Sequence, residues 1–163
     1  MRGVASGHGE DVEMIIGIDP GPNEHALVWF DGERVVRAEN LSTGDAIEAM
    51  TGPTCFPVAC EIVECFGMPV GREVFQTVLQ IGRLKQVAGW MRLIPRRDIK
   101  LHLCGTARAK DANVRQALID KVGPVGTKRN PGPCYGVANH LWSALAVAAT
   151  ALDHEETKNE WRL

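Results

Sequence analysis

The 163-residue sequence has few of the features that mark secreted, zinc-binding or membrane proteins. Its five cysteines are odd in number and include no C-x-x-C pair, so neither a disulfide framework nor a structural zinc site is indicated. No window approaches the roughly 18 consecutive apolar residues of a membrane span, and no basic stretch followed by an apolar run opens the chain. We therefore expect a soluble, cytoplasmic protein with reduced cysteines and no membrane contact.

The net charge of -2 is small, which at first argues against a nucleic-acid partner. The charges are unevenly distributed, however: residues 1–64 hold 3 basic and 12 acidic side chains, residues 65–129 hold 13 and 4, and residues 130–163 hold 2 and 4. If this division survives folding, one face is basic and suits phosphates, while an acidic part can hold cations. The alternative is that the blocks mix on the surface, and charge alone does not decide between the two.

The length fits one domain, which we place at residues 14–153 between a flexible tail at 1–13 and a polar tail at 154–163. β-Branched runs separated by Pro-Gly and Asp-Gly turns predict an antiparallel meander, and helical periodicity appears later in the chain. The expected strands are residues 14–19, 25–30, a third that includes 34–37, 57–63 and 91–94. The expected helices are residues 45–50, 71–89, 95–103, 111–122, with Asp111 as its cap, and 137–152. This order predicts a mixed α/β sheet with helices packed on it.

Two acidic residues lie where a carboxylate is costly to bury. Asp19 ends a buried strand immediately before a Pro-Gly turn, so it is either a turn former or a ligand for a cation. Glu61 interrupts an apolar run and has no basic neighbour in the sequence, so it needs a partner. Glu64 is three residues further and points to the opposite face of a regular strand, so only one of the two can accompany Asp19.

The last expected helix carries a further candidate ligand. His140 and Ser143 stand three residues apart and would share one helix face. A single histidine is more often a hydrogen-bonded structural residue than a ligand. An acid on the first strand, an acid on a central strand and a ligand on a late helix would converge if the strands are neighbours, as two-metal phosphodiester cleavage requires.

Several segments, in this order, resemble one family. Residues 17–21, Gly-Ile-Asp-Pro-Gly, are similar to the first-strand motif of RuvC-type Holliday junction resolvases. Glu61 followed by Phe66 resembles the acid-bearing strand and its loop, residues 105–111 resemble the glycine-containing basic segment, and residues 140–148 resemble the terminal helix. The segments at 66–71 and 130–133 look like the RuvC-like proteins of bacteriophages.

The resemblance implies an RNase H-like fold of RuvC type, with a mixed five-stranded sheet and helices packed on both faces. It also implies a symmetric homodimer that makes paired nicks in four-way or other branched DNA. The family's ligand positions match Asp19, Glu61 and His140, which would bind two divalent ions, Mg²⁺ or Mn²⁺, without an organic cofactor. The cell would be bacterial or a bacteriophage-infected host, and the helix at 71–89 is our candidate for the dimer surface.

One position departs from the family pattern. The family usually has two acids three residues apart on its last helix, whereas this sequence has His140 and Ser143. Neutral imidazole can bind a divalent ion, although it suits Mn²⁺ better than Mg²⁺, and a serine hydroxyl is a poor ligand. A fourth carboxylate is therefore either absent or supplied by Asp111 or Glu64.

The basic part of the sequence offers contacts to DNA phosphates. The candidates we favour lie in or beside the glycine-containing segments: Arg108, Lys110, Arg115, Lys128 and Arg129. Phe66, in a glycine-flanked loop after the acid-bearing strand, either stacks on a base or belongs to the core.

Three functional interpretations are open. The first is a metal-dependent endonuclease that resolves DNA junctions. The second is a catalytically weakened module of the same fold, marked by Ser143, that binds branched DNA without cutting it. The third, a fragment of a sugar kinase or actin-like protein, rests only on the first-strand motif and lacks a second glycine-rich phosphate loop.

Overall fold

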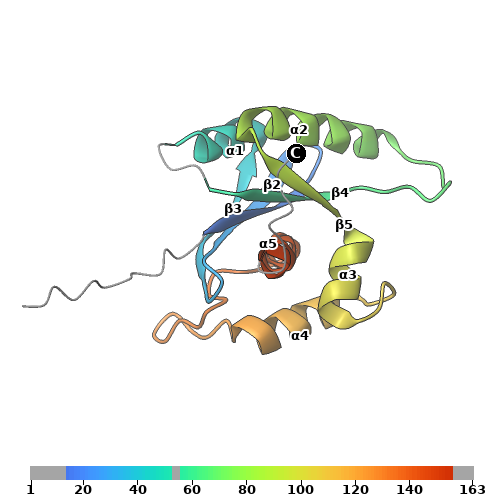
Figure 1. Cartoon of the computed structure of the whole chain (residues 1–163). Helices are drawn as coiled ribbons and strands as arrows, with labels where there is room; N and C mark the ends of the chain where they lie inside the picture. Colours follow the sequence, from blue (N-terminus) through green and yellow to red (C-terminus); the bar gives the residue numbers. More distant parts are fainter. Residues whose placement is uncertain (1–13, 53–55, 156–163) are drawn as a thin grey trace, which may run out of the picture.

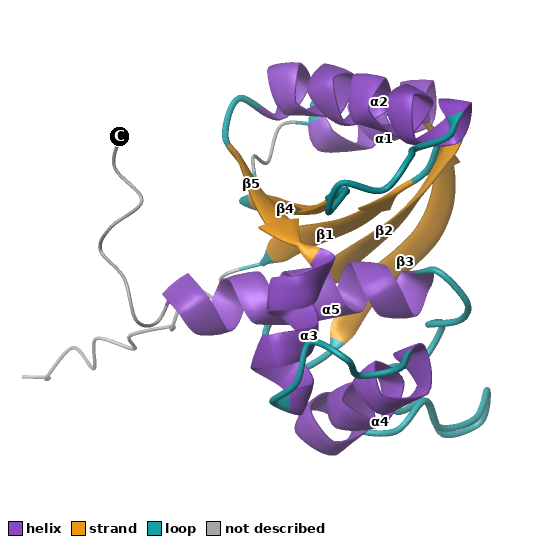
Figure 2. Ribbon diagram, turned by 90° about the vertical axis from the view of Figure 1, so that its right-hand side faces the viewer, coloured by secondary structure: helices purple, strands orange, loops and turns teal. Residues whose placement is uncertain are grey.

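A computed structural model describes residues 14–52 and 56–155, in which helices cover both faces of a five-stranded sheet (Figures 1 and 2). The strand order is β3-β2-β1-β4-β5, so β1 is central. The strands span Ile15–Pro20 (β1), Glu24–Phe30 (β2), Val35–Ser42 (β3), Val58–Ile62 (β4) and Met91–Pro95 (β5). The predicted mixed α/β sheet is confirmed, and the tail predicted at 1–13 lies outside the described residues.

The first three strands form the antiparallel meander that the turn signals predicted. Strand β4 pairs parallel to β1, and β5 pairs parallel to β4. In the turn after β2, the Asp31 carboxylate accepts the backbone N–H groups of Glu33 and Arg34 at 2.9 and 2.7 Å. Strand β3 continues to Ser42, well beyond the predicted 34–37 segment, because it pairs with β2 at the sheet edge although its side chains are largely exposed.

The helices span Thr43–Met50 (α1), Arg72–Ala88 (α2), Arg96–Cys104 (α3), Asp111–Val122 (α4) and Leu141–Glu155 (α5). Ser42 caps α1 by accepting the Asp45 N–H at 3.2 Å. Helix α2 lies between Gly71 and Gly89, and α3 begins directly after Pro95. These helix positions agree with the sequence analysis.

One predicted helix start and one predicted helix cap are wrong, whereas the range predicted for α4 agrees with the structure. Helix α5 begins at Leu141 rather than at 137, because Asn139 has a φ of 48° and Gly136 a φ of 88°, which a right-handed helix cannot include. The residue that caps α4 is Lys110, whose N–H donates to the side chain of Asn113 at 3.0 Å, so Asp111 is the first helical residue instead of the cap. Helix α5 also continues to 155, past the predicted domain end at 153.

The core consists of two apolar layers, one on each face of the sheet. Helices α1 and α2 cover one face, and α5 lies across the other, with α3 and α4 packed beside it (Figure 2). Helix α5 approaches β1 at Gly17, where an added Cβ would overlap the carbonyl oxygen of Ala144 and lie 2.7 Å from the Cβ of Ala148. The glycine of the first-strand motif therefore permits α5 to cross directly over the central strand.

Within the described residues, no helix is both long and apolar enough to cross a membrane. The described cysteines, Cys60, Cys65, Cys104 and Cys134, are free thiols, as expected, and Cys55 lies outside the described residues.

Candidate functional site

Two carboxylates come together at the ends of the neighbouring parallel strands β1 and β4. Ile18 pairs with Cys60 in the register, so Asp19 and Glu61 occupy the next position on each strand. Side chains alternate along a strand, and Ile18 and Cys60 belong to the core layer under α1 and α2. Asp19 and Glu61 therefore point to the α5 face, as the sequence analysis required of a shared site.

Asp19 is largely buried, with 14% of its side chain exposed. Burial raises the pKa of its carboxyl above the ordinary value, and a hydrogen bond with His140 opposes this rise. His140 Nδ1 lies 3.1 Å from Asp19 Oδ2, although the His140 side chain as a whole is 82% exposed. When Nδ1–H donates to the carboxylate, Nε2 is the nitrogen that remains for a ligand.

The partner of Glu61 is Arg96, the first residue of α3. One guanidinium nitrogen of Arg96 donates to both Glu61 oxygens, at 3.2 and 3.1 Å. Only 13% of the Glu61 side chain is exposed, so burial raises its pKa, while the positive charge of Arg96 lowers it and the negative charge of Asp19 raises it further. The two strand-end acids thus share one poorly solvated environment.

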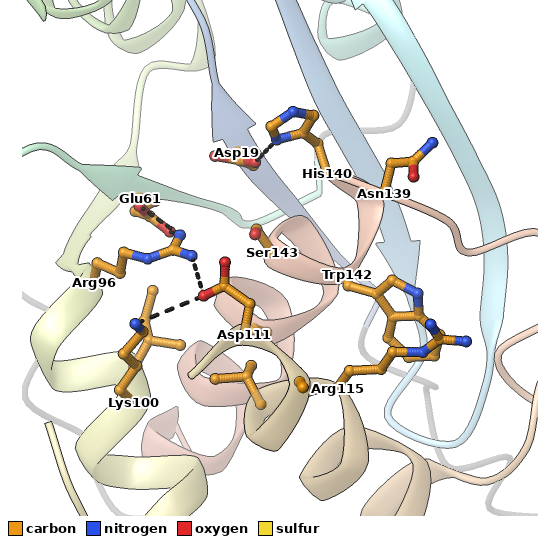
Figure 3. A pocket seen from close by; sticks show the side chains of 14 residues that line it. Asp19, Glu61, Arg96, Lys100, Asp111, Arg115, Asn139, His140, Trp142 and Ser143 are labelled. Carbon is orange, nitrogen blue, oxygen red and sulfur yellow. Dashed lines mark hydrogen bonds and ion pairs between the residues drawn. The ribbon is translucent and has the colours of Figure 1, made fainter. Parts of the chain in front are cut away.

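A third carboxylate, Asp111 at the start of α4, faces the same space. Its Oδ1 accepts from the second terminal nitrogen of Arg96 at 2.7 Å and lies 3.6 Å from Lys100 Nζ. Its side chain is 75% exposed, and the hydrogen bond from Arg96 lowers its pKa. Figure 3 shows Arg96 between Glu61 and Asp111.

These side chains line a cavity of about 580 Å³ between the sheet edge, α3, α4 and the start of α5. Its wall is acidic at Asp19 and Glu61, whereas Arg96, Lys100 and Arg115 lie on the helical side (Figure 3). Apolar side chains complete the lining: Ile99, Ala112, Val114, Trp142 and Ala146. The cavity therefore combines cation-binding carboxylates with anion-binding basic groups, and Asp111 adds a third carboxylate on the helical side.

His140 and Ser143 both line this cavity, but they do not share a helix face as predicted. His140 lies just before α5, and its carbonyl accepts the N–H groups of Ser143 and Ala144 at 3.0 and 3.2 Å. The left-handed residue Asn139 turns the chain so that the His140 ring reaches Asp19. Glu64 is exposed beyond the end of β4 and lines a smaller hollow with Phe66 and Arg97. This hollow adjoins the cavity, because Glu61, Arg96 and Lys100 line both.

The donor set fits an oxygen-preferring divalent ion at the carboxylate end of the cavity. Asp19 and Glu61 are mostly buried and costly to ionise without a cation, which is the usual setting of a carboxylate ligand. In the described part of the chain, no three His, Cys, Asp or Glu side chains are arranged closely enough to hold an ion as they stand. The paired acids would therefore supply only part of a coordination shell, and Arg96 engages one of them.

The predicted DNA-binding residues are exposed but differ in where they lie. Arg115 lines the cavity and stacks its guanidinium over the Trp142 ring, 5.0 Å from the centroid. Phe66 is on the surface, so of its two alternatives the core position is wrong, and base stacking stays a prediction. The remaining four lie outside the cavity lining, in or beside the loops that flank α4: Arg108, Lys110, Lys128 and Arg129.

Sequence reasoning missed Arg96 as the partner of Glu61. The signal was present, because β4 and β5 were both predicted and parallel strands end at the same edge of a sheet. Glu61 pairs with Ile94, so the residue after Pro95 must lie near the end of β4. The pairing of β4 with β5 was not itself predicted. Without that pairing, nothing in the sequence indicates that Arg96 and Glu61, which are 35 residues apart, are in contact.

Comparison with solved structures identifies the fold. The structure of RuvC from Thermus thermophilus matches with a TM-score of 0.65 and 19% identity, over 88% of this chain and 96% of that one. The T. thermophilus RuvC in complex with a Holliday junction substrate matches with a TM-score of 0.66 and 20% identity, over 89% and 96%. No protein-family model matches, and no curated protein matches the sequence significantly. The resemblance in the motifs is thus confirmed at the level of fold.

Proposed function

From the RuvC-type, RNase H-like fold, we propose that this chain is a structure-selective endodeoxyribonuclease that cuts four-way or other branched DNA by divalent-metal-dependent hydrolysis. The observation that carries the proposal is the pair of buried carboxylates, Asp19 and Glu61, side by side at the ends of β1 and β4. They open into a cavity whose other wall carries Arg96, Lys100 and Arg115 together with Asp111. This is the arrangement that phosphodiester hydrolysis needs, because it can hold cations and a phosphate together.

Each side chain of the site has a distinct proposed role. Asp19 and Glu61 are the metal ligands, with His140 as a third once its ring exchanges the hydrogen bond with Asp19 for a bond to the ion. A divalent ion bound there, Mg²⁺ or Mn²⁺, would neutralise charge on the phosphate and lower the pKa of a bound water. Lys100 and Arg115 lie across the cavity, where they would contact the phosphates on either side of the cleaved bond.

A second candidate function is supported by Ser143. This serine lines the cavity at the position where the resembled family usually has an acid. Asp111 is the described carboxylate that faces the cavity and could replace it, but two basic side chains already engage its Oδ1. If neither residue completes the site, the protein is a module that binds branched DNA without cutting it.

A cleavage assay separates the two functions. A labelled four-way junction, a linear duplex and single-stranded DNA are incubated with the protein in Mg²⁺, Mn²⁺ or chelator. We expect metal-dependent nicks in the junction that Asp19→Asn and Glu61→Gln each reduce by about a thousandfold or more, because each removes a ligand. Glu33→Gln, an exposed acid in the turn after β2, is the matched control and should cut like the wild type.

Junction binding without cleavage in either metal would favour the binding module. His140→Ala tests the third ligand, and we expect a reduction of about 10- to 100-fold, smaller than that of either acid. Full activity of His140→Ala would remove His140 from the ligand set while leaving the nuclease proposal intact.

A further inference from the structure

Arg96 is the one described cation that contacts both a strand-end acid and Asp111, and it does so with different nitrogens. One terminal nitrogen engages both oxygens of Glu61, and the other donates to Asp111 Oδ1 at 2.7 Å. The two carboxylates differ sharply in exposure, since Glu61 is 13% exposed and Asp111 is 75% exposed. Arg96 therefore bridges an inner and an outer carboxylate (Figure 3).

The backbone of Arg96 is fixed, whereas its side chain has room to move. Arg96 follows β5 directly, and the pairing of Ile62 with Pro95 holds its Cα beside the end of β4. The side chain is 40% exposed and lines the cavity. Rotation of the outer part of the side chain can break the contact to Glu61 while the contact to Asp111 persists.

Arg96 is the counter-ion of Glu61 only as long as no other cation binds this carboxylate. A buried carboxylate that loses its sole counter-ion is left uncompensated, which is strongly unfavourable. A divalent ion on Glu61 must take at least one of the oxygens that Arg96 occupies, so the two cations compete. An opposite charge at this distance shifts a carboxylate equilibrium by about one to three powers of ten, so the competition is large.

We propose that Arg96 is a resident counter-ion that occupies Glu61 in the metal-free protein, yields it when a divalent ion binds, and is then retained at the cavity by Asp111. This inference rests on the proposed metal site, which it deepens by naming the residue that sets the ion affinity. Arg96 is thus a positioning residue that acts through Glu61. Once released, its guanidinium faces the cavity in which the phosphate would lie.

The test measures binding of Mn²⁺ alone, without DNA, to the full chain at pH 8 by electron paramagnetic resonance of the free ion. The variant is Arg96→Gln, and the matched control is Arg97→Gln, which removes the same charge from the next residue. Arg97 is exposed and lines the smaller hollow beside Glu61, so both variants change the local field. We expect Arg96→Gln to bind Mn²⁺ about tenfold or more tightly than wild type, and Arg97→Gln to stay within about twofold.

Thermal unfolding gives a second measurement that does not depend on activity. Without metal, Arg96→Gln should unfold at a lower temperature than Arg97→Gln, because Glu61 has lost its counter-ion. Saturating Mn²⁺ should raise the unfolding temperature more in Arg96→Gln than in the control. If Arg96→Gln fails to fold, Arg96→Lys replaces it. An ammonium keeps the charge but cannot bridge Glu61 and Asp111, so this variant should also bind Mn²⁺ more tightly than wild type.

The possible outcomes distinguish the counter-ion role of Arg96 from the proposed nuclease function on which it rests. Wild-type Mn²⁺ binding that Arg96→Gln does not tighten beyond Arg97→Gln overturns the counter-ion role and leaves the nuclease proposal standing. Absence of Mn²⁺ binding in both the wild type and Arg96→Gln overturns the metal site itself, and the counter-ion role with it. Binding by Arg96→Gln but not by wild type supports the inference in its strongest form.

Discussion

At the scale of single residues, Asp19 combines a functional role with a cost to the fold. Its folded pKa is raised, so the folded state holds the proton more tightly than the unfolded chain does. The ionised carboxylate therefore destabilises the protein at neutral pH, and this cost disappears as the pH falls through the raised folded value toward the ordinary value of 3.8. A cation bound at the proposed site would offset this cost, and such a trade of stability for function is common at active sites.

We therefore predict that Asp19→Asn stabilises the metal-free protein while abolishing cleavage. In chelator at pH 7 the variant should unfold about 2 °C or more above the wild type, because a neutral amide replaces a poorly solvated charge. The difference should shrink as the pH falls toward the ordinary value of 3.8, because the folded-state carboxyl takes up its proton before the unfolded one does. Differential scanning calorimetry measures both values, with the exposed Asp120→Asn as control. A variant less stable than wild type at pH 7 would show that the His140 bond outweighs burial.

The residue scale also shows what the sequence could predict about the site. Asp19 and Glu61 were identifiable because each places a charge on an otherwise apolar strand, and strand parity then put them on one face. The contact between Arg96 and Glu61 depends on which strands are neighbours, which a single sequence does not encode locally. The position of His140 depends on the left-handed conformation of Asn139. This conformation was not predicted, because the helical pattern of the following segment was extended back over it.

At the scale of elements, the close crossing of β1 and α5 connects the fold to the site. Both carry site residues, and Gly17 is where they meet. The meander, α2 and β5 followed from turn chemistry and apolar periodicity. The end of the edge strand β3 was left open because its partly exposed side chains lack an apolar alternation, and only pairing with β2 defines its length.

We predict that Gly17→Ala destabilises the protein by about 1–3 kcal/mol, since the new methyl overlaps α5 and the two elements must separate. Urea unfolding monitored by tryptophan fluorescence measures the loss. The matched control is Gly52→Ala, where nothing lies within 4 Å of the added Cβ, and its stability should be close to that of wild type. Equal effects of the two substitutions would contradict the close crossing as the reason for this glycine.

At the scale of the whole molecule, the sheet separates two layers with different proposed partners. The basic residues Arg108, Lys110 and Arg115 lie on or beside α4, on one side, whereas α2 covers the other side (Figure 2). If DNA binds over the first layer, its affinity should fall steeply with salt, and each lost phosphate contact should reduce the slope of log K against log salt by about 0.9.

Lys110→Ala should therefore show a shallower slope than wild type in junction binding measured by fluorescence anisotropy. Lys85→Ala, an exposed lysine on α2, is the control from the opposite layer and should keep the wild-type slope. A salt-independent affinity of the wild type would contradict the phosphate path altogether.

We propose the opposite layer as the surface for a second copy of the chain, because the paired nicks of the proposed function need two sites. Helix α2 exposes Phe75, Val78 and Leu79, whose spacing places them along one stripe, and Phe75 and Leu79 are 65% and 64% exposed. Single exposed apolar residues are ordinary, but a contiguous apolar stripe is typical of an interface. A two-fold contact through α2 would leave both cavities open to the DNA, since they lie on the other side of the sheet.

We predict that Leu79→Glu converts a dimer to a monomer in sedimentation analysis, because the interface cannot solvate a buried carboxylate. The control is Leu101→Glu, which changes an exposed leucine of α3 in the opposite layer and should leave the dimer intact. On a plasmid carrying an extruded cruciform, the dimer should release linear product in one binding event, whereas the monomer should accumulate nicked circles. A Leu79→Glu protein that still sediments as a dimer would place the interface elsewhere. Linear product in one binding event from a verified monomer would show that the two cuts do not require two subunits on the same junction.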